Sequence, residues 1–216
     1  MSEEQQLEGI ALSQGVVLEP EPAETHPRNL AVGSRLISSA IAFFFMAFVF
    51  AFFYLRALNT AHSFLEPHVS PPVGWGVAIL ACVLLSCVTF ELGRRSLADG
   101  TGSPWRRMSL LSWVLALAAI VLQLIEYYDL KFGATDGGFA SVFFGFTAVF
   151  GAFWLASVYW VETLWAQSLR QPAAVEAVEV ADPSRLLRPS ADAAVVYLYT
   201  MGVVAIIAFF LLYVVE

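Results

Sequence analysis

Two carboxylates, Glu91 and Glu126, stand at the edges of long apolar segments, where such a group can pair with a cation or carry a proton. Glu91 precedes Arg94 and Arg95 by three and four residues, which is the spacing of ion pairs on a helix. This spacing favours an anchor at the membrane interface. The alternative interpretation of Glu91 is a carboxylate through which protons enter the membrane.

Glu126 has two polar residues of suitable chemistry within reach. Gln123 lies three residues earlier and therefore on the same face of a helix. Arg56 ends the first apolar segment on the side of the membrane where Glu126 also lies. Because two opposite charges at one depth would each be poorly solvated alone, the sequence predicts an ion pair between Arg56 and Glu126.

The positions of the histidines argue against metal chemistry in this chain. All three of them, His26, His62 and His68, lie outside the apolar segments. Haem or copper inside a helical bundle needs imidazole or thiolate ligands that point inward. We therefore expect no haem, no metal and no catalytic residue in the chain itself. The Ser–His and His–x–x–x–His patterns of hydrolases and metalloproteases are also missing from the apolar segments.

The two cysteines, Cys82 and Cys87, lie five residues apart in one apolar segment. Five helical residues turn their side chains about 140° apart. A disulfide between them is therefore excluded, and we interpret both as packing residues. No basic patch with interleaved aromatic residues predicts nucleic-acid binding.

Small side chains recur at helical spacing in the fourth apolar segment and predict a place where helices approach closely. They are Ser141, Gly145, Ala148, Ala152 and Ala156. Phenylalanines crowd the other faces of this segment and most of the first segment. These aromatic faces predict contacts with lipid or between helices, and the alternative is a cleft permeable to lipid or gas.

The composition and the apolar segments predict that membrane-spanning helices position these residues. Hydrophobic residues make up 59% of the 216 residues and charged residues only 13%, about half the ~25% of a soluble protein. A soluble core of this size cannot bury so much apolar surface. Five segments are long enough to cross a membrane core about 30 Å thick. The sequence therefore predicts an all-α membrane protein with five transmembrane helices, at about residues 34–57, 73–93, 107–129, 137–166 and 193–215.

The distribution of lysine and arginine predicts how these helices are oriented. Nine arginines lie on the side of the N-terminus, whereas only Arg56 and Lys131 lie on the other. We therefore expect a cytoplasmic N-terminus and a C-terminus outside. Residues 1–33, rich in glutamate, are expected to form an acidic cytoplasmic arm before the membrane domain of residues 34–216. Residues 171–192 are expected to form a long linker between the last two helices.

Four short motifs occur along the chain, one in each of the first four predicted helices. Residues 50–56 read FAFFYLR, residues 85–89 read LSCVT, residues 122–127 read LQLIEY, and residues 138–144 read GFASVFF. Their order and spacing resemble subunit III of the haem–copper oxidases in its five-helix bacterial form. The most specific motif is LQLIEY, which is similar to the family's Leu-Gln-x-x-Glu-Tyr and includes Gln123, Glu126 and Tyr127. The resemblance covers about Ser34 to Val215.

Three polar positions of that family carry other residues here. The acid of the family's corresponding first helix falls at Ile41, its His-Gly-x-His pattern falls at residues 150–153, and its Trp-His-x-x-Asp stretch falls at residues 198–202. The scaffold thus persists while its polar groups are largely gone. This combination is typical of a divergent member whose task is structural.

The resemblance implies a non-catalytic subunit of a respiratory terminal oxidase of the cytochrome c oxidase type, in the bacterial cytoplasmic membrane. Its partners would be the catalytic subunit I, which would carry the haem and copper, and other respiratory-chain subunits. It would bind phospholipid and support the stability and proton uptake of the enzyme. A quinol oxidase or a nitric oxide reductase is the first alternative, and a small membrane transporter or an assembly factor is the second. Arg56, Glu91, Gln123, Glu126, Tyr127 and the five small residues would be structural or interface residues.

Overall fold

The computed structural model is a bundle of long helices and describes residues 25–58, 64, 69–98, 102–175 and 184–215. Within these residues, the α-helices are α2 (Thr25–Ala57), α3 (Val73–Ala98), α4 (Gly102–Asp129), α5 (Gly138–Val175) and α6 (Ser184–Phe209). A π-helical turn, η1 (Phe210–Val214), continues α6. All five helices are long and apolar enough to cross a membrane. The predicted fold class is confirmed, and the chain is a multi-pass membrane protein.

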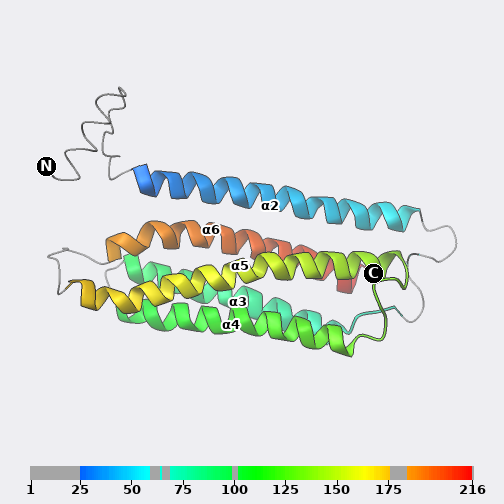
Figure 1. Ribbon diagram of the computed structural model, residues 1–216. Coiled ribbons are helices and arrows are strands. Elements are labelled where there is room, and N and C mark those ends of the chain that lie inside the picture. Colours follow the sequence, from blue (N-terminus) through cyan, green and yellow to red (C-terminus); the bar gives the residue numbers. More distant parts are fainter. Residues whose placement is uncertain (1–24, 59–63, 65–68, 99–101, 176–183, 216) are drawn as a thin grey trace, which may run out of the picture.

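Successive helices run in opposite directions, so the bundle has two distinct ends (Figure 1). At one end α2, α4 and α6 begin and α3 and α5 finish. We call it the arginine-rich end, because it carries Arg28, Arg35, Arg94, Arg95, Arg106, Arg107, Arg170 and Arg188. We call the other end the C-terminal end, since α6 and η1 finish there. It carries Arg56 and Lys131.

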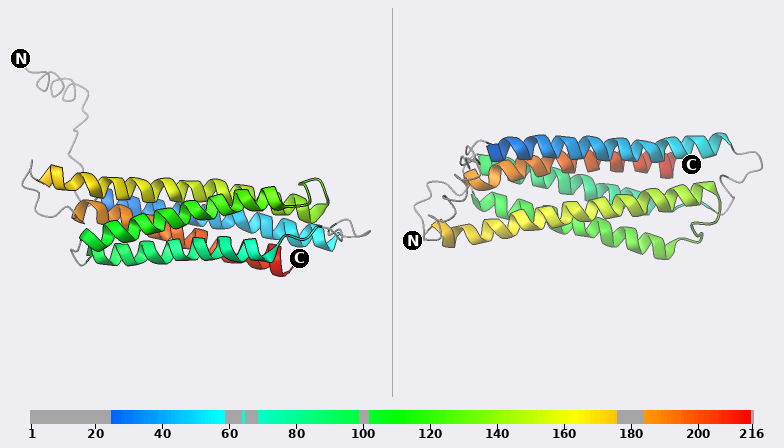
Figure 2. Two further views of the ribbon diagram at one scale, coloured as in Figure 1. Left: turned by 90° about the horizontal axis from the view of Figure 1, so that it is seen from below. Right: turned by 45° about the horizontal axis from the view of Figure 1, so that its top comes forward.

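Helix α6 is central in the bundle and contacts α2, α3 and α5. Its apolar stretch is the most deeply buried of the five, whereas that of α2 is the most exposed. Figure 2 shows α2 lying along α6 from a second direction. Phenylalanine rings join α2 to α5, with centroid distances of 5.2 Å for Phe45–Phe146 and 5.5 Å for Phe48–Phe146. Such aromatic contacts hold much of α2 onto the bundle through packing.

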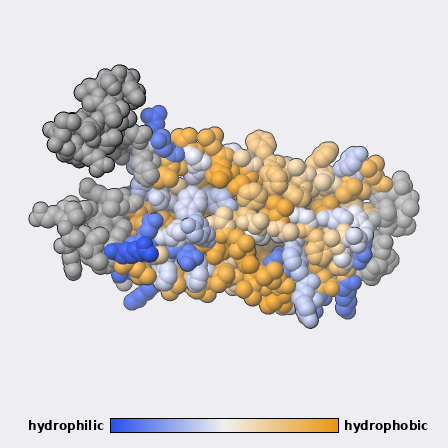
Figure 3. All heavy atoms as spheres, in the orientation of Figure 1, coloured by the Kyte–Doolittle hydropathy of each residue, from blue (hydrophilic) through white to orange (hydrophobic). Residues whose placement is uncertain are grey.

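The surface is apolar between the two ends. Figure 3 shows hydrophobic side chains gathered along the middle of the bundle and hydrophilic ones toward its ends. Helix α2 contributes exposed aromatic residues, among them Phe43 and Phe50. A face of this kind suits hydrocarbon surroundings, where exposed apolar side chains carry no penalty.

The observed helices are longer than the predicted ones. Helix α2 begins at Thr25, so residues 25–33 are helical and do not belong to an arm; the rest of the expected arm lies outside the described residues. The expected linker at 171–192 is also largely wrong, because α5 continues to Val175 and α6 begins at Ser184. Hydropathy detects only the part of a helix inside the bilayer core, whereas these helices continue beyond it as more polar turns.

Candidate functional site

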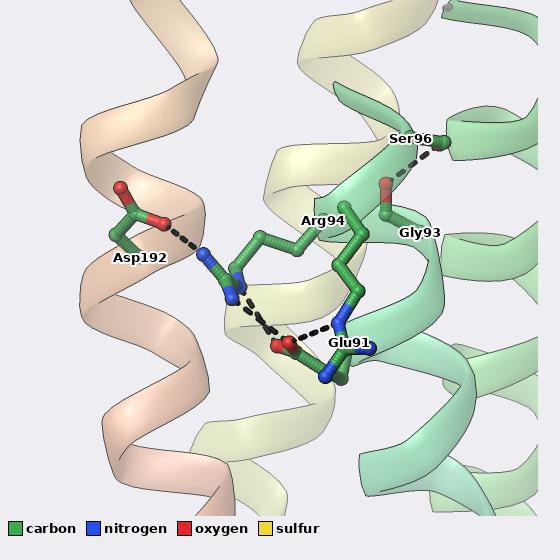
Figure 4. Close-up of polar contacts among 6 residues, drawn as sticks. Glu91, Gly93, Arg94, Ser96 and Asp192 are labelled. Carbon is green, nitrogen blue, oxygen red and sulfur yellow. Dashed lines mark hydrogen bonds and ion pairs between the residues drawn. The ribbon is translucent and has the colours of Figure 1, made fainter. Parts of the chain in front are cut away.

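The first polar cluster lies at the arginine-rich end and joins α3 to α6 (Figure 4). Arg94 donates from Nε and Nη2 to the two carboxylate oxygens of Glu91, at 2.7 and 2.8 Å. Its Nη1 donates to Asp192 on α6, also at 2.7 Å. Arg95 adds a further hydrogen bond of 2.8 Å from its Nε to Glu91. The predicted pairing of Glu91 with both arginines is therefore present.

This arrangement balances charge at the membrane boundary. The Glu91 side chain is 10% exposed and accepts hydrogen bonds from two guanidinium groups. Arg94 binds it in forked geometry, which is the strong form of a carboxylate hydrogen bond, and Arg95 adds a single bond. Arg94 is 27% exposed and Arg95 67% exposed, so water reaches the second arginine more freely. The contact of Arg94 with Asp192 was not predicted. Asp192 could have been found from its position one residue before the last apolar segment, because Arg94 lies at the same boundary.

The second polar cluster lies at the C-terminal end and joins α4 to η1. Glu126 is fully buried and accepts hydrogen bonds of 2.7 Å from Gln123 Nε2 and from the Tyr213 hydroxyl. The predicted proximity of Gln123 and Glu126 is thus observed. Tyr213 had not been predicted, because no local spacing links two residues that lie 87 positions apart.

The π-helical turn and a glycine place Tyr213 over Glu126. The backbone N–H of Val215 donates to the carbonyl of Phe210, five residues earlier, at 2.9 Å. Such wide turns are frequent where a helix must present a particular side chain. On the facing helix α3, Gly76 lies under the Tyr213 ring, and a Cβ there would come within 2.7 Å of the ring. Gly76 therefore leaves the space that the ring occupies.

The predicted ion pair between Arg56 and Glu126 is wrong. Arg56 donates from Nη1 to the backbone carbonyl of Val215, and Glu126 has only the neutral partners Gln123 and Tyr213 among the described residues. The physical reason lies in the packing order, because α2 packs along α6 and so meets the C-terminal turn. Both side chains nevertheless form hydrogen bonds with the C-terminal turn of the chain. Arg56 bonds to the carbonyl of Val215, and Glu126 bonds to the hydroxyl of Tyr213.

Tyr127 and Asp129 extend this end of the bundle toward α5 and α3. The Tyr127 hydroxyl lies 2.6 Å from the hydroxyl of Thr147 on α5. Trp75 Nε1 on α3 donates to Asp129 Oδ2 at 3.1 Å. Together with Glu126, the last turn of α4 thus contacts three other elements through polar side chains.

A smaller polar contact joins α3 and α4 in the middle of the bundle. The hydroxyls of Ser86 and Ser112 each donate to the other residue's backbone carbonyl, both at 2.9 Å. The adjacent Cys87 donates from its thiol to the carbonyl of Leu198 at 3.3 Å. Cys82 and Cys87 are both free thiols, which confirms that they do not form a disulfide.

The stripe of small residues on α5 does not lie between helices of this bundle. Ala148, Ala152 and Ala156 are exposed, as is Ser141. Gly145 is half-buried, and a Cβ on it would meet only the Phe48 ring, at 3.4 Å. The inward face of α5 carries larger residues instead, namely Phe146, Phe150 and Trp154. Close approach of a helix from another subunit to the stripe stays a prediction. The stripe is open to lipid or to another chain.

An apolar groove of about 460 Å³ lies between α2 and α6. Phe146 of α5 lines it as well. The other lining residues are Ala42, Phe45, Met46 and Val49 of α2, and Val196, Tyr199, Thr200, Val203, Val204 and Ile207 of α6. The groove was not located from the sequence, since the pairing of α2 with α6 depends on the tertiary packing.

Among the described residues, no three His, Cys, Asp or Glu side chains converge. The Cys87 thiol is occupied by a backbone carbonyl, and the carboxylates of Glu91 and Glu126 are occupied by arginine and by neutral donors. The arrangement can hold helices together and can bind apolar molecules at its surface.

Comparison with known proteins finds similarity over part of the chain to proteins named cytochrome c oxidase subunit 3. The chain is 31% identical to the cytochrome c oxidase subunit 3 of Danio rerio over 137 residues, which cover 57% of this chain and 49% of the relative. It is 30% identical over the same shares to the proteins of that name from Formosania lacustris and Polypterus ornatipinnis. The chain thus spans about half the length of the curated relatives it matches. No family model matches the sequence.

Proposed function

We propose that the chain is a non-catalytic, subunit III-type component of a respiratory haem–copper terminal oxidase of the cytochrome c oxidase type. The supporting observation is its similarity to proteins named cytochrome c oxidase subunit 3. The order of short motifs along four of the five helices is consistent with it. The partner would be the haem- and copper-bearing subunit I, and the membrane would be the bacterial cytoplasmic membrane.

Its role in that complex would be mechanical. The two polar clusters would keep the bundle rigid, and its apolar faces would pack against the partner and against phospholipid. A rigid, lipid-filled neighbour would sustain proton uptake and lengthen the working life of the catalytic subunit. No reaction step would use a residue of this chain, and in support of this the Glu91 and Glu126 carboxylates and the Cys87 thiol are engaged in structural contacts.

Purification in mild detergent tests this proposal. We expect the tagged chain to bring down a haem protein in one-to-one stoichiometry, measured by the haem absorption spectrum and quantitative mass spectrometry. Oxygen consumption with reduced cytochrome c or with quinol, and nitric oxide consumption, would then distinguish the oxidase from its close alternatives. Isolation as a lone oligomer would contradict the proposal and favour a transporter. A transient, substoichiometric association would contradict it in favour of an assembly factor.

The exposed stripe on α5 offers a sharper test of the interface. Gly145→Leu should reduce the amount of chain recovered with the haem protein, because a bulky side chain blocks close approach of another helix. Gly151→Leu is the matched control on the same helix, since open space surrounds the Cβ position of Gly151. Equal recovery of both variants would show that the stripe is not an interface.

A further inference from the structure

A small cavity lies in the core of the bundle next to the Glu126 cluster. It has a volume of about 30 Å³ and lies between α3, α4, α5, α6 and η1. Most of its wall is apolar, but three polar side chains line it, namely Gln123 of α4, Thr147 of α5 and Tyr213 of η1. A buried water needs about 10–15 Å³ and about two to four polar partners. The cavity therefore has room for one water beside polar groups that can bind it.

The Gln123 side chain keeps unused hydrogen-bonding capacity at this cavity. Its Nε2 donates one N–H to Glu126 at 2.7 Å. A carboxamide carries two N–H donors and an oxygen with two lone pairs. Within the part of the chain that the structure describes, the second N–H and Oε1 of Gln123 have no hydrogen-bond partner. Gln123 can therefore both donate a hydrogen bond to a cavity ligand and accept one from it.

The hydroxyls of Thr147 and Tyr213 can accept a further hydrogen bond but cannot donate one. The Thr147 hydroxyl donates to the carbonyl of Phe143 at 2.6 Å, so it accepts from the Tyr127 hydroxyl, which lies 2.6 Å away. The Tyr213 hydroxyl donates to Glu126 at 2.7 Å. A hydroxyl has one proton to donate and two lone pairs that accept. Both oxygens therefore keep an acceptor site for a ligand that donates.

A water molecule matches this set of groups. It can accept from the second N–H of Gln123 and donate to the Thr147 oxygen, with its other proton directed to Oε1 of Gln123 or to Tyr213. Empty cavities are a feature of wholly apolar linings. If this cavity were dry, the unused donor and acceptor of Gln123 would lie in a mostly apolar wall without a partner, which costs free energy.

We propose that the cavity holds one internal water, hydrogen-bonded to Gln123 and Thr147. The water would complete a continuous hydrogen-bonded chain across this end of the bundle. In order, its members are Tyr127, Thr147, the water, Gln123, Glu126 and Tyr213. The chain would join α4 to α5 and to the C-terminal turn, and would hold the Gln123 amide in the orientation that binds Glu126. The site is a property of the folded chain and goes beyond the proposed function, because it does not depend on a partner.

Radiolytic labelling tests this site in the purified, full-length protein with whatever partner copurifies. X-rays convert bound water into hydroxyl radicals, which oxidise the side chains that touch the water, and mass spectrometry locates the oxidised residues. We expect oxidation of Phe150, which lines the cavity, well above that of Phe90, which is fully buried and lines neither the cavity nor the groove. Oxidation of Phe150 at the level of Phe90 would mean a dry cavity and would overturn the proposal.

Two substitutions of Thr147 form a matched pair for the same measurement. Thr147→Val keeps the shape of the side chain without its hydroxyl and should reduce the oxidation of Phe150 toward the level of Phe90. Thr147→Ser keeps the hydroxyl and should retain the wild-type oxidation. Equal oxidation of Phe150 in the two variants would overturn the proposal. The oxidation of the wild-type protein stays decisive if either variant fails to fold.

Filling the cavity is a second test that does not rely on radicals. Ala205 lines the cavity, and Ala205→Val places additional carbon atoms there. Displacing a bound water should lower the melting temperature, whereas filling a dry cavity would raise it. In the Thr147→Val background, where the water is bound more weakly, the same substitution should lower the melting temperature less. A rise in the wild-type background, or equal decreases in the two backgrounds, would overturn the proposal.

Discussion

The two ends of the bundle stabilise a buried carboxylate in different ways. At the arginine-rich end, Glu91 is held by two guanidinium groups, one of which also reaches Asp192 on a second helix. At the C-terminal end, Glu126 is fully buried and held by an amide and a phenol. The first arrangement balances charge close to water. The arrangement at the C-terminal end depends on side-chain packing, because only packing brings its neutral donors within hydrogen-bond distance of Glu126.

This contrast has an energetic consequence. Ion pairs that water and salt can reach contribute little stability and tolerate the loss of a partner. A buried acceptor with two donors cannot be removed so cheaply, because its removal leaves both donors unpaired in an apolar site. The C-terminal end should therefore be the more sensitive of the two.

The largest expected effect is that of Glu126→Ala. It leaves the Gln123 amide and the Tyr213 hydroxyl without an acceptor, and should lower the free energy of unfolding by about 3 kcal/mol. Glu126→Gln keeps an acceptor oxygen for Tyr213 and should lose about half as much. Thermal unfolding of the purified protein in detergent measures both. Equal losses, or no loss in the alanine variant, would show that the hydrogen bonds of Glu126 do not stabilise this end.

Gly76→Ala should have the next largest effect. The new Cβ would lie within 2.7 Å of the Tyr213 ring and push it away from Glu126. Overpacking of this kind costs about 1–3 kcal/mol. Gly74→Ala is the control on the same helix, since nothing lies within 4 Å of that position. If the two variants melt at the same temperature, the ring does not depend on the space left by Gly76.

At the arginine-rich end, Arg94→Ala should cost more than Arg95→Ala. Arg94 has forked contact with Glu91 and also reaches Asp192, so we expect a loss of about 1–2 kcal/mol. Arg95 is 67% exposed, and its single contact should contribute less than about 0.5 kcal/mol. Unfolding at low and high salt measures both losses, and salt should shrink the smaller one. Equal effects would mean that the link to α6 adds nothing.

A small effect, comparable to that of Arg95→Ala, is expected for the serine pair in the middle of the bundle. Ser86→Ala should cost about 0.6 kcal/mol, the usual contribution of a hydrogen bond between transmembrane helices. The two hydroxyls form one reciprocal contact, so the Ser86→Ala/Ser112→Ala variant should lose less than the sum of the single variants. A double-mutant cycle on unfolding free energies measures the coupling. Strict additivity would show that the two hydroxyls act independently.

The polar contacts show which kind of inference from sequence succeeds. Glu91 with Arg94 and Arg95, and Gln123 with Glu126, were predicted because a helix fixes the relation of residues three or four positions apart. The pairing of Arg56 with Glu126 failed, because equal depth in the membrane does not determine which helices are neighbours. Tyr213 and Asp192 were missed for the same reason, since each meets its partner through the packing of α6.

The small-residue stripe on α5 illustrates a related limit. Helical spacing correctly places Ser141, Gly145, Ala148, Ala152 and Ala156 along one line. It does not tell whether that line faces another helix of the same chain. In the bundle the large aromatic residues of α5 face inward, and the alanines are exposed.

The amino-acid sequence by itself determined that the chain crosses the membrane with five helices, because apolar length and the absence of charge are local properties of each segment. It also determined the contacts within single turns. Only the tertiary structure decided that α6 lies at the centre, that Tyr213 rests on Gly76 beside Glu126, and that a groove opens between α2 and α6. Those outcomes depend on which side-chain surfaces fit together across helices, and no spacing along one helix contains that information.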